Sequence, residues 1–461
     1  MNEALENISM FLSNTGEKEL ACKVLDVFGK RAINFEHFDE VSRCFFKIKD
    51  YDKAIYFGEK AYAIASSSQQ MYIIRANLTN VYNHNNMPEK ALRYIKANES
   101  VMPDDNDRDF ERAYSHFLMN DKNAAAKLLR SKVGNPTLTE EQRVKLDFNL
   151  GTYDMIDGNL QQGLKRFLWS GEKMKIWDHH TFFQQDNSID SYGFTRWDGT
   201  IKQGQNILII AEAGIGDEVI NARFFVKLKE LGMNPLWMTL TSRKDLAEIY
   251  NLNGITTISG VKEIPPEFTD FVAVPSMHIP IFLNSSYETL WNGPYLTNTF
   301  KEYDEKWKIL TSLSGDRKKI GIRWQGNPAY DQDLHRSVPL KKMKEALEHI
   351  DADFFSIQKD TGIEQLTEWD DLIDLAPQSE NLKDLFSYIK QMDIIVTSCT
   401  SIAHIAGAMG KEVYVWVPIS CYYVWCNSTK QSPWYADNMH VLYQAKPRSW
   451  DNCVEEMKTL L

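Results

Sequence analysis

The chain is poor in the residues that mark fibrous, disulfide-built and disordered proteins. Its 461 residues include only 6 Cys, 15 Pro and 23 Gly, against 43% hydrophobic and 25% charged residues. The cysteines show no close pairing that suggests a zinc or redox site, so we expect reduced thiols. This composition predicts a globular protein, and at roughly 150 residues per domain the length predicts about three domains.

Long apolar runs are also absent. The longest, 207–211 and 413–419, are far too short to cross a bilayer. Residues 1–6 lack the basic region and apolar core of a signal peptide. We therefore expect a soluble, cytoplasmic protein without a transmembrane segment.

Basic charge is in deficit in both parts of the chain, residues 1–200 and 201–461. There are 52 Lys and Arg against 63 Asp and Glu, a net charge of −11. The balance is −3 over residues 1–200 and −8 over residues 201–461. A protein that binds chiefly to nucleic-acid phosphates needs a basic excess, so nucleic acid is disfavoured as the main partner, although net charge does not exclude a local basic groove.

The first 170 residues contain a weak internal repeat. Small residues recur at intervals of 37, 34 and 38 residues, at Ala54, Ala91, Ala125 and Gly163. An aromatic residue precedes each of them at helical spacing: Phe46, Tyr82, Phe117 and Tyr153. Small residues let neighbouring helices approach, and aromatics fill the space beside them. The pattern resembles tetratricopeptide repeats, which form a concave docking surface, and the alternative is an ordinary helical bundle.

After a turn-rich linker, predicted over 171–206, the pattern changes to apolar strands alternating with helices. The first strand, 207–210, runs into a turn containing Gly214 and Gly216, and then into a predicted helix over 219–231. Further strands are predicted around 237–238, 255–258 and 271–275, and residues 281–318 contain no clear strand. Strand, glycine turn and helix form the opening of a doubly wound unit, although Val219 breaks the G-x-G-x-x-G dinucleotide spacing.

A second set of such units begins near residue 319. Strands are predicted at 319–323, 354–358, 394–396 and 413–417, with a helix over 402–409. In open parallel sheets, ligands bind beyond the carboxyl ends of the strands. Six polar residues stand at such positions and are expected to face one crevice between two halves: Asp217, His278, Asn327, Gln358, Thr400 and Ser401.

Several motifs, in this order, resemble those of bacterial tetratricopeptide-containing glycosyltransferases. These glycosyltransferases are relatives of the lipopolysaccharide heptosyltransferases and, more distantly, of O-linked N-acetylglucosamine transferases. The motifs cover 196–199, 212–218, 321–328, 335–340, 356–358, 400–410 and 432–435. Their spacing matches as well as their residue types, and the repeats before them also fit.

The resemblance implies a GT-B fold, in which two Rossmann-like halves follow the all-α repeat domain. It implies repeats over 1–170, an acceptor half over 207–315 and a donor half over 316–461. The activity implied is metal-independent, inverting transfer of a sugar from a nucleotide-diphosphate donor to an acceptor hydroxyl. No cofactor or metal is expected, and the repeats would dock the acceptor or a protein partner.

Asp217 matches the aspartate that these enzymes use as general base; the alternative is that it caps the helix after the turn. Arg336 stands where relatives place a cation on the diphosphate, and the alternative is a surface arginine. Thr400 and Ser401 begin a helix whose free N–H groups favour a phosphate, and they can also act as caps.

The remaining assignments concern donor and acceptor contacts. His404 is expected at a ribose or phosphate, with a packing role as the alternative. Asn327 and Gln358 are expected to contact the base or a phosphate, Gly214 and Gly216 to let backbone approach the ligand, and His278 to face the acceptor. Relatives often have aspartate where this chain has Cys399, which we interpret as a buried small residue and not a nucleophile.

Two other functions are compatible with the sequence. The chain could be a scaffold in which a degenerate transferase domain binds without chemistry, or an epimerase acting on nucleotide sugars. The acceptor itself is not predicted: a glycan, a lipid-linked saccharide, a protein hydroxyl and a modified nucleobase all meet the same catalytic needs.

Overall fold

The computed structural model describes residues 2–99, 105–174, 193–291, 293–426 and 429–461. The chain divides into two compact units, residues 1–146 with 445–448 and residues 147–444 with 449–461. None of the described helices combines the length and apolarity needed to span a bilayer.

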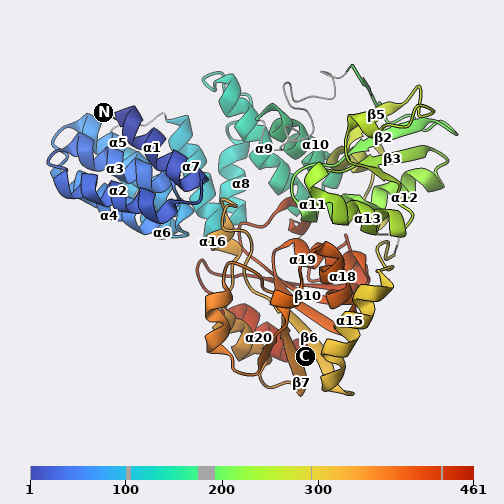
Figure 1. The fold of residues 1–461 in the computed structure, drawn as a ribbon. Helices are drawn as coiled ribbons and strands as arrows, with labels where there is room; N and C mark the ends of the chain where they lie inside the picture. Colours follow the sequence, from blue (N-terminus) through green and yellow to red (C-terminus); the bar gives the residue numbers. More distant parts are fainter. Residues whose placement is uncertain (1, 100–104, 175–192, 292, 427–428) are drawn as a thin grey trace. The chain divides into compact units, whose positions relative to one another are not determined.

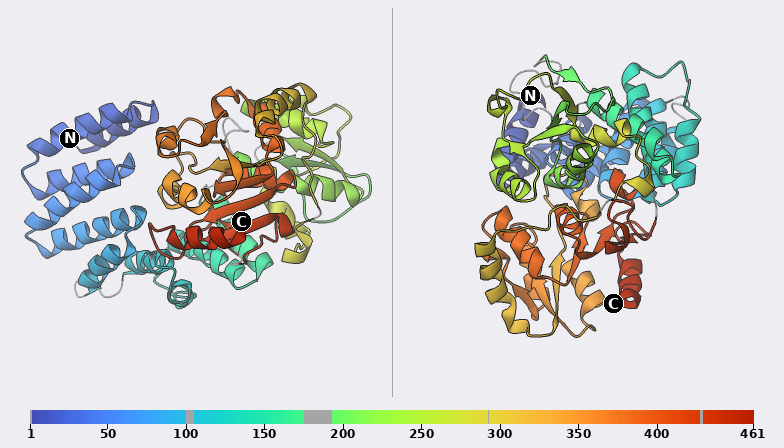
Figure 2. Two further views of the ribbon diagram at one scale, coloured as in Figure 1. Left: turned by 90° about the horizontal axis from the view of Figure 1, so that it is seen from below. Right: turned by 90° about the vertical axis from the view of Figure 1, so that its right-hand side faces the viewer.

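The N-terminal region is helical, and the helices of the first unit lie side by side in chain order as antiparallel pairs (Figure 2). The described helices are α1 (Asn2–Asn14), α2 (Lys18–Arg31), α3 (Phe35–Lys47), α4 (Tyr51–Ile64), α5 (Ser68–His84), α6 (Pro88–Glu99), α7 (Asn106–Leu118), α8 (Lys122–Arg130), α9 (Glu140–Ile156) and α10 (Leu160–Lys173). The first unit holds α1 to α8 and the start of α9, whereas the rest of α9 and α10 belong to the second unit.

The predicted repeats are confirmed as helix pairs. Ala54, Ala91, Ala125 and Gly163 are each buried at the fourth position of the second helix of a pair. Most of the preceding aromatics are buried too, and Phe46 is half-buried. The structure adds an earlier pair, α1 with α2, in which Ala21 occupies the same position.

The last helix pair crosses at two glycines. A methyl group on Gly163 would lie 2.7 Å from the carbonyl oxygen of Gly151 and 2.9 Å from the backbone nitrogen of Met155. A methyl group on Gly151 would lie 2.7 Å from the backbone nitrogen of Phe167. Because the obstacles are backbone atoms, no side-chain rotation relieves the overlap. The two glycines therefore fix where α10 lies against α9.

The first Rossmann-like half contains a parallel sheet with the strand order β1-β5-β2-β3-β4 (Figure 1). Its strands are β1 (Thr195–Arg196), β2 (Asn206–Ile210), β3 (Asn234–Met238), β4 (Thr257–Ile258) and β5 (Val272–Pro275). Its helices include α11 (Ile215–Asn221), α12 (Arg223–Glu230), α13 (Lys244–Leu252) and α14 (Ile279–Phe282). From β2 the chain adds β3 and then β4 on one side, and β5 pairs with the other edge of β2.

The second half repeats this construction in a parallel sheet of order β11-β10-β9-β6-β7-β8. Its strands are β6 (Lys318–Arg323), β7 (Ala352–Ser356), β8 (Leu372–Asp374), β9 (Ile394–Ser398), β10 (Glu412–Val417) and β11 (Met439–Tyr443). Its helices include α15 (Lys301–Thr311), α16 (Asp333–Arg336), α17 (Leu340–Leu347), α18 (Leu382–Gln391), α19 (Ser401–Ala408) and α20 (Asp451–Leu460).

The buried faces explain why these segments form strands. Every residue of β9 is buried, as expected of a central parallel strand covered on both faces. One core cluster joins Trp324, Trp416 and residues of α17 and α20. In another contact, the Trp307 and Tyr388 rings of α15 and α18 stack at 4.1 Å. The expected architecture of two Rossmann-like halves after helical repeats, as in GT-B proteins, is confirmed.

Some local predictions differ from the structure. The helix predicted over 219–231 is divided into α11 and α12 at Ala222, and α11 already begins at Ile215. Strands β1, β8 and β11 were not predicted because β1 and β8 are short and β11 carries polar His440. Much of the predicted 171–206 linker lies outside the described residues, since 175–192 are not described.

The helix crossing yields a stability prediction. We expect Gly163→Ala to lower the free energy of unfolding by about 1–3 kcal/mol, because the new methyl group meets backbone atoms in a packed crossing. Chemical denaturation of the full chain measures this loss. Gly260→Ala is the control, since a methyl group there has no neighbour within 4 Å. Equal stability of the two variants would contradict the tight crossing.

Candidate functional site

Each sheet has one point at which the chain changes direction, and most predicted site residues lie there. In the first sheet this point is between β2 and β5, whose carboxyl ends lead to Asp217 and His278. In the second it is between β6 and β9, which lead to Arg336 and Thr400. Such switch points open a crevice at the carboxyl ends of parallel strands, where ligands bind.

Asp217 lies in the first turn of α11. Its Oδ2 accepts a hydrogen bond from the backbone N–H of the N-cap residue Gly214 at 3.1 Å, which is the half of a capping box that the third helical residue supplies. The alternative role as a helix cap is therefore present in the structure. This single hydrogen bond uses only part of the accepting capacity of the Asp217 carboxylate. The side chain is half-buried.

The electrostatic surroundings of Asp217 favour proton exchange near neutral pH. Burial raises the pKa of this carboxyl to about 6, although hydrogen bonds from Tyr422 and Gly214 and the charge of Arg243 act in the opposite direction. A carboxylate with this pKa is ionised at pH 7 and is a stronger base than an exposed aspartate. No sequence motif indicated Tyr422, which follows β10 and is distant from Asp217 in the chain.

The turn before α11 is strained and externally braced. Ala213 has a φ of 55°, in the left-handed region that a residue with a Cβ rarely adopts. Arg243 donates a hydrogen bond to the Ala213 carbonyl at 2.8 Å and also pairs with the buried carboxylate of Glu218. Arg243, which sequence analysis missed, thus fixes the backbone that carries Asp217.

Helix α11 of the first half lies directly against α19 of the second. A methyl group on Gly216 would approach Cδ2 of His404 to 2.9 Å and Cα of Ser401 to 3.4 Å. Gly216 therefore permits a close crossing that brings Asp217 to the start of α19. This packing role replaces the predicted contact between Gly216 and a ligand; Gly214 stays exposed at the turn.

His404 is a neutral, packed residue. Its Nδ1 lies 3.0 Å from the hydroxyl of Tyr435, and its ring stacks on Trp425 at 5.4 Å. Burial, and then the charge of Arg223, lower the pKa of His404 to about 3. The ring can exchange hydrogen bonds at neutral pH, but it supplies no positive charge to a phosphate. These contacts agree with the alternative that His404 is a packing residue.

The start of α19 has donor groups that its own cap does not use. Thr400 occupies the N-cap position with extended backbone, φ −135° and ψ 175°, and its side chain makes no capping hydrogen bond. Its hydroxyl instead lies 3.2 Å from that of Thr397. Ser401, the first helical residue, is half-buried. The N–H groups of this first turn, together with the helix dipole, can bind an anion.

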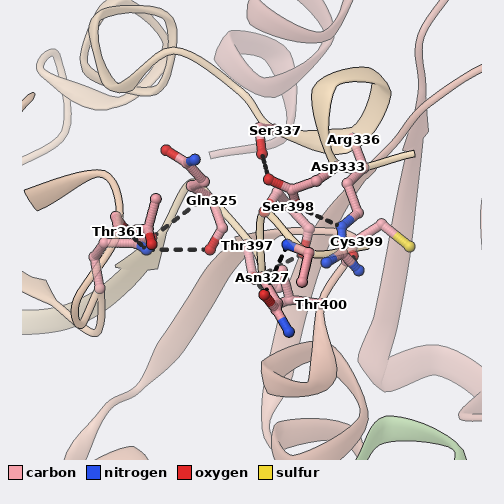
Figure 3. A network of polar contacts seen from close by, with 12 residues as sticks. Gln325, Asn327, Asp333, Arg336, Ser337, Thr361, Thr397, Ser398, Cys399 and Thr400 are labelled. Carbon is pink, nitrogen blue, oxygen red and sulfur yellow. Dashed lines mark hydrogen bonds and ion pairs between the residues drawn. The ribbon is translucent and has the colours of Figure 1, made fainter. Parts of the chain in front are cut away.

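The guanidinium of Arg336 points toward the start of α19 (Figure 3). Its Nε donates to Asp333 at 2.9 Å, and its Nη1 donates to the carbonyl of Cys399 at 3.2 Å, one residue before the Thr400 cap. The guanidinium also lies over the Tyr330 ring, 4.5 Å from its centroid. Arg336 is therefore anchored and not a loose surface side chain. Both Tyr330 and Cys399 interact electrostatically with Asp217 as well as Arg336.

Arg323 adds a second cation at the end of β6. Burial, and then the nearby charge of Arg336, lower the pKa of Arg323 to about 10. Its Nη1 donates to the carbonyl of Ile357 at 3.1 Å. Its buried Nε has no hydrogen-bond partner among the described residues. Asp333 pairs with Arg336, and the charges of Asp360 and Asp333 oppose this lowering of the Arg323 pKa.

Two predicted ligand contacts prove to have structural tasks. The buried Gln358 side chain accepts from the backbone N–H groups of Trp324 and Gln325, and donates to the carbonyls of Gln325 and Thr361. These four bonds use its full amide capacity, so Gln358 holds the loop after β6 instead of a ligand. Asn327 is exposed, and its Oδ1 closes a turn by accepting from the Ala329 N–H at 2.9 Å.

His278 is buried behind the first-half turn. Its Nδ1 lies 3.7 Å from Oε2 of Glu212, and that same oxygen accepts from the N–H of Met277 at 2.9 Å. These two contacts of Glu212 link the end of β5 to the end of β2. Only 4% of His278 is exposed, which does not favour the predicted contact with an acceptor.

Cys399 remains a protonated thiol in these surroundings. Burial raises its pKa to about 11, and its Sγ accepts from the indole N–H of Trp425 at 3.1 Å. A protonated thiol is a poor nucleophile. The geometry supports the interpretation of Cys399 as a packing residue.

Sequence analysis also missed Arg223, which holds the two halves together. From α12, it donates to the carbonyl of Leu290 at 3.0 Å and to that of Trp434 in the second half. Four aromatic rings surround its guanidinium within 5.5 Å: Trp291, Tyr295, Trp434 and Tyr435. The last two belong to the quoted 432–435 motif, which thereby acquires a structural role.

A groove of about 820 Å³ lies elsewhere in the second unit. It is lined by the turn at Gly158, by Tyr287 and by residues of the 429–441 segment and α20. An ion pair between Lys430 and Glu456 crosses its lining at 2.6 Å. None of the predicted site residues lines it, so the candidate site rests on the switch points and not on this groove.

Comparison with known proteins places these features among similar folds. No family model and no curated protein matches the sequence. ADP-heptose lipopolysaccharide heptosyltransferase II of E. coli is 14% identical, covers 56% of this chain and 98% of its own, and has a TM-score of 0.36. A family 9 glycosyl transferase from Veillonella parvula is 11% identical, with coverages of 57% and 90% and a TM-score of 0.41.

A mutant O-GlcNAc transferase from Thermobaculum terrenum covers 100% of this chain and 90% of its own, at 10% identity and a TM-score of 0.33. These are likenesses of fold.

The raised pKa of Asp217 yields a pH-dependent stability prediction. The folded pKa of about 6 exceeds the ordinary value of 3.8, so the folded state binds more protons between these values. Wild-type stability should therefore fall, relative to Asp217→Asn, as pH rises from about 4 to about 6. The variant retains an oxygen for the Gly214 N–H and should be more stable at pH 7 by on the order of 2 kcal/mol.

Denaturation curves of both proteins from pH 4 to pH 8 measure this difference. A stability difference that does not change with pH would show that Asp217 titrates normally.

Proposed function

We propose that the chain is a glycosyltransferase that moves a sugar from a nucleotide-diphosphate donor to an acceptor hydroxyl, with inversion and without a metal. One observation carries the proposal: the close crossing of α11 and α19 brings a carboxylate base to a helix N-terminus flanked by an anchored arginine. Base and anion site are thus neighbours, which single-displacement transfer requires.

In the proposed reaction, Asp217 accepts the proton of the acceptor hydroxyl while that oxygen forms a bond to the anomeric carbon of the donor sugar. The bond from that carbon to the diphosphate oxygen breaks, and its electron pair leaves with the diphosphate. A single displacement of this kind inverts the configuration at the anomeric carbon. The ionised state of Asp217 at pH 7 suits it to this step.

The leaving diphosphate needs positive potential. Arg336 supports this role because its guanidinium is oriented by Asp333 and lies beside the first turn of α19, whose N–H groups add their dipoles. A guanidinium offers paired donors to phosphate oxygens and can serve where other enzymes use a metal cation. We assign Thr400 and Ser401 to the same phosphate and His404 to a neutral hydrogen bond.

The acceptor and the partners belong to the same proposal. The acceptor is a hydroxyl of a glycan, a lipid-linked saccharide, a protein or a modified nucleobase. The helix pairs dock that acceptor or a protein partner on their concave surface, and the enzyme works in the cytoplasm.

The base assignment yields the first activity prediction. We expect Asp217→Asn to lose at least about 99% of transfer, because general-base catalysis commonly contributes 10²–10⁴-fold. Donor binding should persist, because the substitution leaves Arg336 and α19 intact. Transfer is measured by mass spectrometry of products, and binding by calorimetry.

Full transfer by Asp217→Asn would remove Asp217 from the base role. Donor binding without transfer by wild type, over a broad acceptor panel, would instead favour the scaffold. A changed sugar formed without acceptor would favour the epimerase.

The second prediction tests Arg336 through a neighbouring glycine. A methyl group on Gly326 would overlap the Arg336 guanidinium, which can move because it ends a flexible side chain. We expect Gly326→Ala to weaken nucleoside-diphosphate binding by about tenfold, the scale of one charge-assisted contact, with little change in melting temperature. Calorimetry and thermal denaturation measure the two effects.

Gly260→Ala is the matched control because a methyl group there meets nothing. Unchanged diphosphate affinity in both Gly326→Ala and Arg336→Ala would contradict the role of Arg336.

A further inference from the structure

Two cysteine side chains face each other in the loop after β10. The sulfur atoms of Cys421 and Cys426 lie 3.7 Å apart, in contact but not bonded. Their spacing along the sequence did not predict a pair. Between them the chain forms one 3₁₀ turn, Tyr423–Trp425, which brings the two ends of the segment together. Two thiols in contact can form a disulfide with little movement of the chain.

The other cysteines of the second unit have different contacts. Cys399 accepts from the indole N–H of Trp425 at 3.1 Å, and the Cys453 thiol donates to the carbonyl of Leu442 at 3.7 Å. Burial raises the pKa of Cys399 to about 11 and that of Cys453 to about 12. Both therefore keep their protons at neutral pH and react slowly, so they serve as internal standards for the pair.

The two members of the pair differ in access from solvent. Cys421 is 8% exposed, whereas Cys426 is 1% exposed and donates its thiol to the carbonyl of Tyr422 at 3.4 Å. Only a small oxidant can pass such an opening, and it reaches Cys421 first. Cys426 then stands behind Cys421 as the thiol that completes a disulfide.

The loop that carries the pair also contacts the candidate site. Trp425, the residue before Cys426, donates to Cys399 and stacks on the His404 ring of α19 at 5.4 Å. The backbone carbonyl of Cys399 accepts from Arg336 at 3.2 Å. A displacement of Cys426 is therefore transmitted through Trp425 to the start of α19.

We propose that Cys421 and Cys426 form a reversible disulfide on reaction with a hydroperoxide, and that this bond acts on the start of α19 through Trp425. Formation of the disulfide is independent of the proposed function. Only its effect on diphosphate binding rests on that function.

The reaction proceeds in two steps. The Cys421 thiolate attacks one oxygen of hydrogen peroxide, the O–O bond breaks, and Cys421 becomes a sulfenic acid. The leaving hydroxide takes up the proton that Cys421 has lost and forms water. Cys426 then attacks the Cys421 sulfur, the S–S bond forms, and the sulfenic hydroxyl leaves as a second water with the Cys426 proton. Two thiols are thereby oxidised and one peroxide is reduced; a dithiol reductant reverses the change.

The test locates the oxidised cysteines in the full chain. The protein is treated with hydrogen peroxide, unfolded in an alkylating reagent, digested with trypsin and measured by mass spectrometry. Both members of the pair fall in one tryptic peptide, 412–430, whereas Cys399 and Cys453 fall in two others. We expect peptide 412–430 to lose two hydrogen atoms and carry no alkyl group, and to take up two alkyl groups after treatment with dithiothreitol. Cys399 and Cys453 should be alkylated throughout.

Serine variants test the order of the two steps. Cys426→Ser should hold Cys421 as a sulfenic acid, which dimedone labels, and Cys421→Ser should leave Cys426 unlabelled. Cys453→Ser is the matched control, because it removes a buried thiol outside the pair and should form the disulfide as wild type does. Alkylation of both paired cysteines after peroxide treatment, or a disulfide that includes Cys399, would overturn the proposal. Labelling of Cys426 alone would overturn the assignment of Cys421 as the thiol attacked first.

Calorimetry with nucleoside diphosphates measures the effect on α19. We expect oxidation of wild type and of Cys453→Ser to weaken binding by about three- to tenfold, the scale of one hydrogen bond, because the contact of Trp425 with Cys399 belongs to the thiol form. Cys426→Ser should show no such change. If the disulfide forms but the reduced chain binds no diphosphate, the proposed function fails and the redox pair stands. If the disulfide forms and the affinity does not change, the action on α19 is wrong.

Discussion

The site depends on one contact, the crossing of α11 over α19 at Gly216. Because residue 216 has no side chain, the His404 ring and the Ser401 backbone come within ordinary contact distance of α11. The two sheets each place a loop at their switch point, and this crossing brings the loop before α11 next to the loop before α19. Asp217 follows Gly216 directly, and Ser401 follows the Thr400 cap. Asp217 and the start of α19 are therefore neighbours, and Arg223 donates hydrogen bonds to carbonyls of both halves.

Several groups near this contact are held in energetically unfavourable states. Asp217 and Arg323 have pKa values displaced by burial toward their neutral forms, and Ala213 has a positive φ. Such features accumulate at functional sites, where surrounding structure must enforce them. Here Arg243 fixes the Ala213 carbonyl, Gln358 fixes the loop after β6, and Asp333 orients Arg336.

Sequence patterns predicted the strands and the switch-point loops because buried parallel strands are nearly continuous apolar runs. They also predicted the helix pairs, whose small residues recur at the same helical position. They did not predict what each polar side chain does. Gln358 and Arg336 both follow strands, but one satisfies four backbone groups and the other lies beside the start of α19. Tyr422, Arg243 and Arg223 were missed because their partners are distant in the chain. Only the folded structure shows which polar atoms are already satisfied.

The central claim is that the crevice between the two halves binds a nucleotide-diphosphate sugar at the start of α19. The most direct measurement is calorimetric titration of the full chain with uridine, adenosine, guanosine and cytidine diphosphates and with their sugar derivatives. The account predicts saturable binding of at least one diphosphate and of its sugar form, competing for one site and weakened in Arg336→Ala. Absence of binding by every member of this panel, to a folded chain, would contradict it.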